Sequence, residues 1–207
     1  MATKDIFEAV LACDVVGTPD KVKAELDAGT NAEAILKAGL IAAMDELGGR
    51  FSNGDVFIPE MIRAAKAMQA GVEVLKPFLT QGLFQSAGTV VIGTVKGDLH
   101  DIGKNLVKMM LEGAGFKVID LGVDVSAERF AASAKENSAD IVAMSALLTT
   151  TTPTMGQAVA AIKKQGLKAK TIVGGSPVTQ SFADKIQADG YAEDAKGAVE
   201  LVRRLMK

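Results

Sequence analysis

The feature that most constrains the fold is a change in hydrophobic periodicity part-way along the chain. From Lys4 to about Phe78, apolar residues recur at three- and four-residue steps, and no alternating run predicts a strand. From Thr89 onward, short runs rich in β-branched residues are each followed by a helix-like segment. A chain of 207 residues has room for two modest units. We therefore predict an all-α unit followed by an α/β unit.

Local signals predict where two helices of the first half begin. Thr18 followed by Pro19 is typical of an N-cap with proline at the first helical position. Thr30 with Glu33 three residues later is typical of a capping box. We therefore expect one helix to begin at each of these points.

Glycine and proline predict where the helices end. Gly48 and Gly49 are expected to end the helix that follows Thr30. The next helix should begin near Pro59 and end before Pro77, because proline removes a helical hydrogen bond. The count is then about four helices, which predicts a small four-helix bundle.

Four short β-branched runs define the second half of the chain. They lie at residues 89–95, 116–121, 140–145 and 170–175, and a short fifth strand is expected near Tyr191. Strands that alternate with helices imply right-handed crossovers and a parallel sheet covered on both faces. We predict a doubly wound α/β fold, flavodoxin-like or Rossmann-like, with five parallel strands. The expected domains are a helical bundle over 1–80, a linker over 81–88 and the α/β domain over 89–207.

The predicted topology also indicates where a ligand would bind. In open α/β sheets, ligands bind beyond the carboxyl ends of the strands, where the strand order reverses. The loops after Val95, Ser145 and Val173 are therefore the expected site.

Composition excludes several classes of function. With 23 basic and 25 acidic side chains, nothing attracts the chain generally to nucleic acid or to an anionic membrane. No window approaches the roughly 18 consecutive apolar residues of a membrane span. Cys13 is the only cysteine and cannot form an intramolecular disulfide. The first residues lack the features of an export signal, so we expect a cytoplasmic protein.

The only histidine, His100, lies in the loop after the first predicted strand. A lone histidine is most often a structural residue. Here Asp98 lies two residues before it and can accept the proton of one ring nitrogen, which leaves the other nitrogen free to bind a metal. The chain has no second histidine and no cysteine pair, so a zinc or iron site built by the protein alone is poorly supported. The metal would have to bring its own equatorial ligands, as a tetrapyrrole-like cofactor does.

Three short motifs together resemble a known family. They are Asp98-x-His100-x-x-Gly103, Ser145-x-Leu147 and Gly174-Gly175, in this order and each at the end of a predicted strand. They resemble the three-part signature of cobalamin-binding domains that bind the cofactor base-off with histidine on. The run 93–105 is similar to methionine synthase and to the corrinoid proteins of methyltransferase systems. The run 48–61 resembles their helical cap, so the resemblance covers nearly the whole chain.

The resemblance implies a role for each motif residue. His100 would be the lower ligand of cobalt, and Asp98 and Thr151 would complete a hydrogen-bonded chain with it. Methionine synthase has a serine where this chain has Thr151, which keeps the hydroxyl, although a neighbour in the run 149–152 could supply it instead. The positions that would contact the cofactor are Phe51, Ile58, Gly97, Asp98, His100, Asp101, Ile102, Gly103, Ser145, Leu147, Thr149, Gly174 and Gly175.

The resemblance also gives a physical reason for several of these residues. Small residues would let the nucleotide tail of the cofactor enter the α/β domain, with Gly103, Gly174 and Gly175 leaving space and Ser145 offering a hydroxyl. Their alternative explanation is ordinary tight turns. Phe51 would shield the other face of the cofactor from water, together with Ile58. The alternative is that both are core residues of the bundle.

The function that the resemblance implies is a corrinoid carrier in one-carbon metabolism. A donor-specific methyltransferase would transfer a methyl group to cob(I)alamin, and an acceptor methyltransferase, folate-dependent ones included, would take it from methylcobalamin. A reductive activase would be a third partner, and the chain is not expected to turn over a substrate alone. The sequence does not choose among methanol, methylamine, aryl methyl ether and quaternary amine donors. The alternatives are a cobalamin-dependent sensor or regulatory module and the small subunit of a carbon-skeleton mutase.

Overall fold

The computed structural model describes residues 3–79 and 86–207, and the chain divides into two compact units. The first unit comprises residues 1–86 with 113–115, and the second comprises 87–112 and 116–207. Most of the predicted linker, residues 81–85, lies outside the described residues. No helix within the two described ranges combines the length and the apolar character that crossing a membrane requires.

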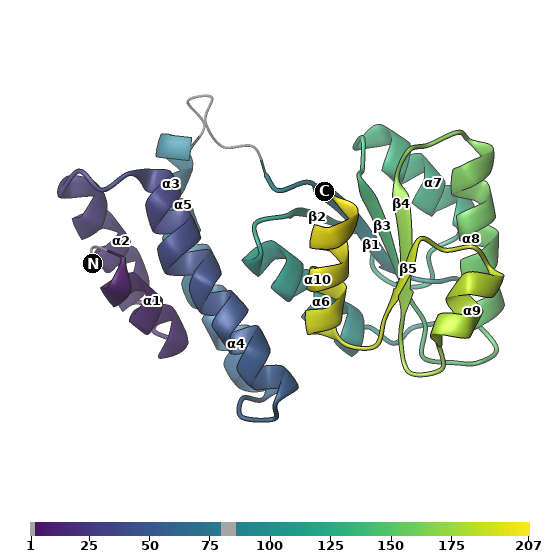
Figure 1. Ribbon diagram of the computed structural model, residues 1–207, viewed down its shortest axis with the longest axis horizontal. Helices are drawn as coiled ribbons and strands as arrows, with labels where there is room; N and C mark the ends of the chain where they lie inside the picture. The colour runs from purple at the N-terminus through teal and green to yellow at the C-terminus, as the bar shows by residue number, and fades with distance from the viewer. Residues whose placement is uncertain (1–2, 80–85) are drawn as a thin grey trace. The chain divides into compact units, whose positions relative to one another are not determined.

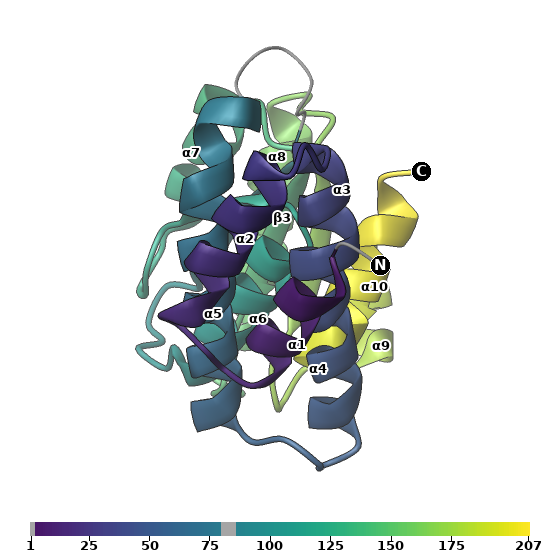
Figure 2. The same cartoon turned by 90° about the vertical axis from the view of Figure 1, so that its left-hand side faces the viewer.

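The first unit consists of helices alone over its described residues. They are α1 (Lys4–Leu11), α2 (Gly17–Asp27), α3 (Ala32–Ala34), the π-helix η1 (Ile35–Ile41), α4 (Ala42–Ser52) and α5 (Ile58–Leu79). Because α3, η1 and α4 follow without a break, these elements form four helical segments, and α5 packs against α1, α2 and α4 (Figure 2). Fully buried side chains such as Ile6, Leu40 and Met61 form its core. This confirms the predicted N-terminal helical bundle.

The helix predicted to begin after Thr18 starts earlier. Helix α2 begins at Gly17, so Thr18 lies inside it and is not the N-cap. The Thr18 hydroxyl donates to the backbone carbonyl of Asp14 over 2.6 Å, and the Asp14 carboxylate accepts from the Gly17 amide over 2.7 Å. The prediction was wrong because Asp14 supplies the acceptor that Thr18 was expected to provide.

The capping box predicted at Thr30 is also wrong by one residue. The N-cap is Asn31, whose side chain accepts from the amides of Glu33 and Ala34. The Thr30 hydroxyl instead donates to the Glu25 carboxylate over 2.6 Å. Asparagine is as good an N-cap as serine or threonine, and here its side-chain oxygen reaches the free amides directly.

Neither the glycine pair nor the proline ends its helix. Helix α4 continues through Gly48 and Gly49 to Ser52, because Leu47 and Gly48 are buried and this packing offsets a propensity loss of about 1 kcal/mol per glycine. Helix α5 includes Pro77, which lies only two residues from its end at Leu79. A proline so close to the end of a helix removes one of its last hydrogen bonds and leaves the preceding turns intact.

The second unit is a five-stranded parallel sheet in the order β2-β1-β3-β4-β5. Its strands are β1 (Thr89–Thr94), β2 (Lys117–Asp120), β3 (Ile141–Ser145), β4 (Lys170–Gly174) and β5 (Gly190–Ala192). Its helices are α6 (Ile102–Gly113), α7 (Ala127–Glu136), α8 (Thr152–Lys164), α9 (Gln180–Lys185) and α10 (Ala195–Leu205). Figure 1 shows α6 and α10 on one face of the sheet and α7 and α8 on the other. This confirms the predicted doubly wound fold.

The hydrophobic core of this unit places the loops that follow the strands. Val91, Val142 and Val173 of the central strands pack with Phe130 of α7 and Met155 of α8, all of them buried. The sheet is covered on both faces, as is usual for parallel strands. The strand order reverses between β1 and β3, and in folds of this kind the ligand site lies at the carboxyl edge of the sheet beside the loops that follow these two strands.

Candidate functional site

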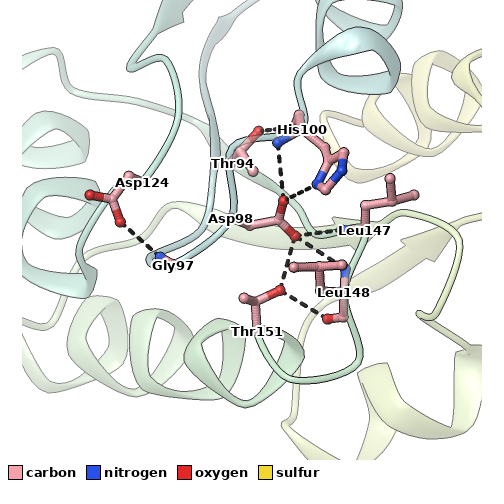
Figure 3. A network of polar contacts seen from close by, with 8 residues as sticks. All are labelled: Thr94, Gly97, Asp98, His100, Asp124, Leu147, Leu148 and Thr151. Carbon is pink, nitrogen blue, oxygen red and sulfur yellow. Dashed lines mark hydrogen bonds and ion pairs between the residues drawn. The ribbon is translucent and has the colours of Figure 1, made fainter.

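The loop between β1 and α6 presents His100 at the carboxyl edge of the sheet. The Nδ1 atom of His100 lies 2.7 Å from Oδ1 of Asp98 (Figure 3), and about half of the histidine side chain is exposed. Among the described residues, none forms a hydrogen bond with Nε2. One ring nitrogen is therefore fixed by the protein, and the other is open to a ligand.

Asp98 is fully buried, and its carboxylate accepts five hydrogen bonds. Oδ1 accepts from the amide and the ring of His100. Oδ2 accepts from the amides of Leu147 and Leu148, over 2.7 and 3.2 Å, and from the Thr151 hydroxyl over 2.9 Å. The loops after β1 and β3 thus converge on one carboxylate.

These contacts keep Asp98 charged. Burial alone would raise the pKa of Asp98, but the hydrogen bonds from the Leu147 amide and from His100 outweigh it and hold that pKa well below its usual range. The Thr151 hydroxyl contributes in the same direction. A charged carboxylate favours the tautomer of His100 that carries its proton on Nδ1, which leaves the lone pair of Nε2 available to a metal.

The structure distinguishes among the threonines of the run 149–152. Thr151 is buried, and its hydroxyl lies 2.9 Å from both Oδ2 of Asp98 and the carbonyl of Leu148. The Thr152 hydroxyl instead donates to the carbonyl of Thr149, and Thr149 itself is exposed. Of this run, Thr151 is therefore the residue that the structure brings to the Asp98–His100 pair.

A cavity of about 680 Å³ opens beside His100. Its lining residues are Leu99, His100, Asp101, Ile102, Gly103, Ser145, Ala146, Leu147, Gly175, Ser176, Tyr191 and Glu193. Seven of the predicted positions are among them, whereas Gly97, Asp98, Thr149 and Gly174 are not. A cavity of this size, lined by small and apolar residues together with polar side chains, is typical of a small-molecule site.

The lining also includes polar residues that sequence analysis did not identify. Ser176 follows β4, and Tyr191 and Glu193 lie at the end of β5. Burial raises the pKa of Tyr191 and the charge of Glu193 raises it further, so the phenol is a neutral donor at physiological pH. These residues could have been found by applying the carboxyl-edge rule to every strand rather than to three of them.

The glycines of the motifs serve different purposes. A Cβ atom at Gly175, where φ is +119°, would lie 2.0 Å from the carbonyl oxygen of Ala146. At Gly174 it would lie 2.8 Å from the carbonyl oxygen of Ala192. Both glycines are therefore required by the approach of neighbouring backbone within the chain. At Gly103, by contrast, an added Cβ would meet no atom within 4 Å.

Large apolar side chains surround His100 without being covered. Leu99 and Ile102 are each 72% exposed, and Leu147 and Leu148 are 45% and 41% exposed. A cluster of exposed apolar residues around an open ring nitrogen indicates a ligand with a broad apolar surface.

The donor set suits a metal that arrives with its own ligands. No group of three or more histidine, cysteine, aspartate or glutamate side chains in residues 3–79 and 86–207 could hold a metal ion. One available imidazole nitrogen, exposed apolar side chains and an adjoining cavity of about 680 Å³ therefore fit a metal macrocycle that needs one axial ligand from the protein.

The two predicted cap residues belong to the first unit. Phe51 lies in the last turn of α4 and is partly buried, and Ile58 is the first residue of α5 and is 38% exposed. Phe57 beside it is 66% exposed and was not identified from the sequence. Ile58 is thus not a core residue of the bundle.

Comparison with known proteins identifies the family. Family models described as B12 binding domain match residues 88–200 and residues 2–76. The chain belongs to the B12-binding corrinoid proteins. The expected corrinoid cofactor is thereby confirmed.

Similar corrinoid proteins are found in Methanosarcina species. The chain is 43% identical over 209 residues to dimethylamine corrinoid protein 1 of Methanosarcina acetivorans, covering 98% of this chain and 96% of that protein. It is also 43% identical to trimethylamine corrinoid protein 1 of Methanosarcina mazei, covering 98% of each. Among solved structures, a chain of the methanol:cobalamin methyltransferase complex of Methanosarcina barkeri matches with a TM-score of 0.88 and 28% identity, over 97% of this chain and 78% of that chain.

Proposed function

We propose that this corrinoid protein carries a methyl group for a methyltransferase system and that His100 is the lower axial ligand, with the cofactor bound base-off. The observation that supports this most directly is the arrangement at His100, where Asp98 fixes Nδ1 and Nε2 is open beside the cavity. When bound, the corrinoid supplies a cobalt centre that can accept a methyl group and release it again.

The residues of the chain would perform three tasks at this site. Asp98 and Thr151 hold the proton of His100 on Nδ1, which keeps the lone pair of Nε2 available to the metal. The exposed leucines and Ile102 offer an apolar surface to the macrocycle. Ser145, Ser176 and the phenol of Tyr191 offer hydrogen bonds to the tail of the cofactor within the cavity.

We further propose that the bundle, residues 1–80, acts as a cap that excludes water from the opposite face of the cofactor. The exposed positions of Phe57 and Ile58 support this, since neither is needed to complete the bundle core. Phe51 would contribute from the neighbouring turn. Residues 81–88 would link the cap to the cofactor-binding domain over 89–207.

The comparisons favour methylated amines as the donor class. The relatives at 43% identity are named dimethylamine and trimethylamine corrinoid proteins, whereas the methanol complex is 28% identical. We infer that the partners are a methyltransferase specific for a methylated amine, an acceptor methyltransferase and a reductive activase.

The axial role of His100 can be tested by spectroscopy. In the His100→Ala protein reconstituted with cobalamin, the nitrogen hyperfine splitting that the histidine imparts to the paramagnetic cobalt(II) form should disappear, and the visible spectrum should shift. Added imidazole should restore both signals, because it can occupy the space of the deleted ring. If His100→Ala leaves the splitting and the spectrum of the wild type unchanged, His100 is not the lower ligand.

A further inference from the structure

The loop after β2 is bonded to the loop that carries His100. Val95 and Val125 form a parallel bridge beyond the ends of β1 and β2. The Val125 amide donates to the Thr94 carbonyl over 3.0 Å, and the Thr94 amide donates to the Gly122 carbonyl over 2.9 Å. The pairing of β1 with β2 is thereby extended to the edge of the site.

Within the loop after β2, Asp124 bonds to the backbone of Gly97 and Asp98. Its Oδ1 accepts from the Gly97 amide over 2.8 Å (Figure 3), and its own amide donates to the Asp98 carbonyl over 3.0 Å. Its Oδ2 accepts from Lys96 over 2.8 Å. The two backbone contacts lie on either side of the segment 97–98, so they fix the direction in which the Asp98 side chain leaves the backbone.

The backbone of Asp124 is in the left-handed region, with φ +57°, and Gly97 opposite has φ +85°. Among residues with a side chain, aspartate and asparagine tolerate this conformation best. A conformation of this kind persists where surrounding contacts hold it, and here the side chain and the amide of Asp124 both have partners in the His100 loop.

We propose that Asp124 is a positioning residue, which sets the place of Asp98 and through it the orientation of the His100 ring. The Asp98 carboxylate accepts hydrogen bonds from two different loops. The His100 ring lies on one side and the Leu147 amide on the other, and each donor–acceptor distance is 2.7 Å. Hydrogen bonds this short tolerate little displacement of the acceptor. The far end of the loop is held separately, because the buried Thr94 hydroxyl donates to the His100 carbonyl over 2.9 Å.

Of the contacts of the Asp124 side chain, the hydrogen bond from the Gly97 amide is the one that positions Asp98. The ion pair of Asp124 with Lys96 joins side chains that are 43% and 59% exposed, and ion pairs at such exposure contribute little. The hydrogen bond from Gly97 acts on the backbone next to Asp98, so its loss is the change expected to reach the histidine.

Two substitutions separate this role from backbone strain. Asp124→Asn and Asp124→Gly both tolerate the left-handed conformation, but only asparagine keeps an acceptor for the Gly97 amide. Lys96→Met serves as the control for the ion pair alone.

The first measurement uses the full-length protein without corrinoid. His100 is the only histidine, so its ring ¹⁵N signals are unambiguous. Wild type, Asp124→Asn and Lys96→Met should carry the ring proton on Nδ1, whereas Asp124→Gly should give a mixture of the two tautomers. The second measurement is the affinity for cobalamin. It should fall about tenfold in Asp124→Gly, the lower end of the effect of removing an outer contact of a metal ligand, and change less than about twofold in the other two variants.

The proposal is overturned if Asp124→Gly keeps both the tautomer and the affinity of the wild type, or if Asp124→Asn loses them to the same extent as Asp124→Gly. Should Asp124→Gly not fold, Asp124→Ser replaces it, because the serine hydroxyl is too short to reach the Gly97 amide. The proposal rests on His100 being the lower ligand. If the cobalt(II) form of the wild type shows no histidine splitting, that assignment fails, while the tautomer comparison still decides the role of Asp124.

Discussion

Gly103→Ala should make the corrinoid-free protein more stable and its binding of corrinoid weaker. Gly103 is the second residue of α6 and has ordinary backbone angles, and an added Cβ would meet no atom within 4 Å. Replacing such a glycine by alanine lowers the conformational entropy of the unfolded chain. The free energy of unfolding should therefore rise by about 0.4 to 1 kcal/mol.

The effect on binding should have the opposite sign. Gly103 lines the cavity, so the space that its new methyl group would occupy is the space proposed for the cofactor. Forcing one extra methyl group into a packed contact typically costs about 1 to 3 kcal/mol, which corresponds to a roughly 5- to 150-fold loss of affinity.

The assay combines urea denaturation of the corrinoid-free protein with a spectroscopic titration of cobalamin. Gly49→Ala is the matched control, because Gly49 is also a helical glycine with no atom within 4 Å of an added Cβ and lies in α4. It should raise stability and leave affinity unchanged. An unchanged affinity in Gly103→Ala would show that the cofactor does not pass this residue. A lower stability would refute the argument that Gly103 has space and backbone angles suited to alanine.

Two further predictions concern the cap and the acid stability of the fold. Alanine at Phe51 or Ile58 should increase the photolysis quantum yield of bound methylcobalamin. The free energy of unfolding should fall by only about 1 kcal/mol, since Ile58 is 38% exposed. An unchanged quantum yield in folded protein would exclude shielding. The Asp189 side chain is 26% exposed, and this partial burial alone would raise its pKa, but hydrogen bonds from the Thr171 amide and hydroxyl, helped by Lys170, outweigh burial and lower that pKa. Its contribution to stability is therefore complete above about pH 4, near the pKa of an unfolded aspartate, and is lost as the pH falls through the lower folded value. Urea denaturation between about pH 5 and pH 2 should accordingly show a shallower loss of stability in Asp189→Asn than in the wild type, and equal slopes would contradict this.

The class of fold could be predicted because it depends on patterns that run through whole segments. The β-branched runs marked the strands to within a residue or two at each end, as in the run 89–95 that became Thr89–Thr94. The ends of helices depend on single contacts instead. Whether Thr30 or Asn31 caps a helix is decided by which oxygen reaches the free amides, and Gly48 stays helical because it and Leu47 are buried.

The residues of the candidate site also differ in whether the sequence alone could predict them. Asp98 and His100 are two residues apart, so their pairing is visible in the sequence. Asp124 and Tyr191 have no such local signal, because they come to the site through the strand order that places β2 and β5 on either side. The resemblance led to Thr151, and only the hydrogen bonds of the folded chain separate it from its threonine neighbours. The roles of these residues in binding and transfer stay predictions.

The glycine pair at the end of β4 bears on whether the protein folds before or after it binds the corrinoid. The contacts that exclude a side chain at Gly174 and Gly175 come from the carbonyls of Ala192 and Ala146, which belong to the chain itself. In the described residues, every buried polar side-chain atom also has a partner within the protein. Folding of the α/β unit therefore need not wait for the corrinoid. A cell with little corrinoid would then accumulate the folded protein without its cofactor, and this protein would bind corrinoid later without new synthesis.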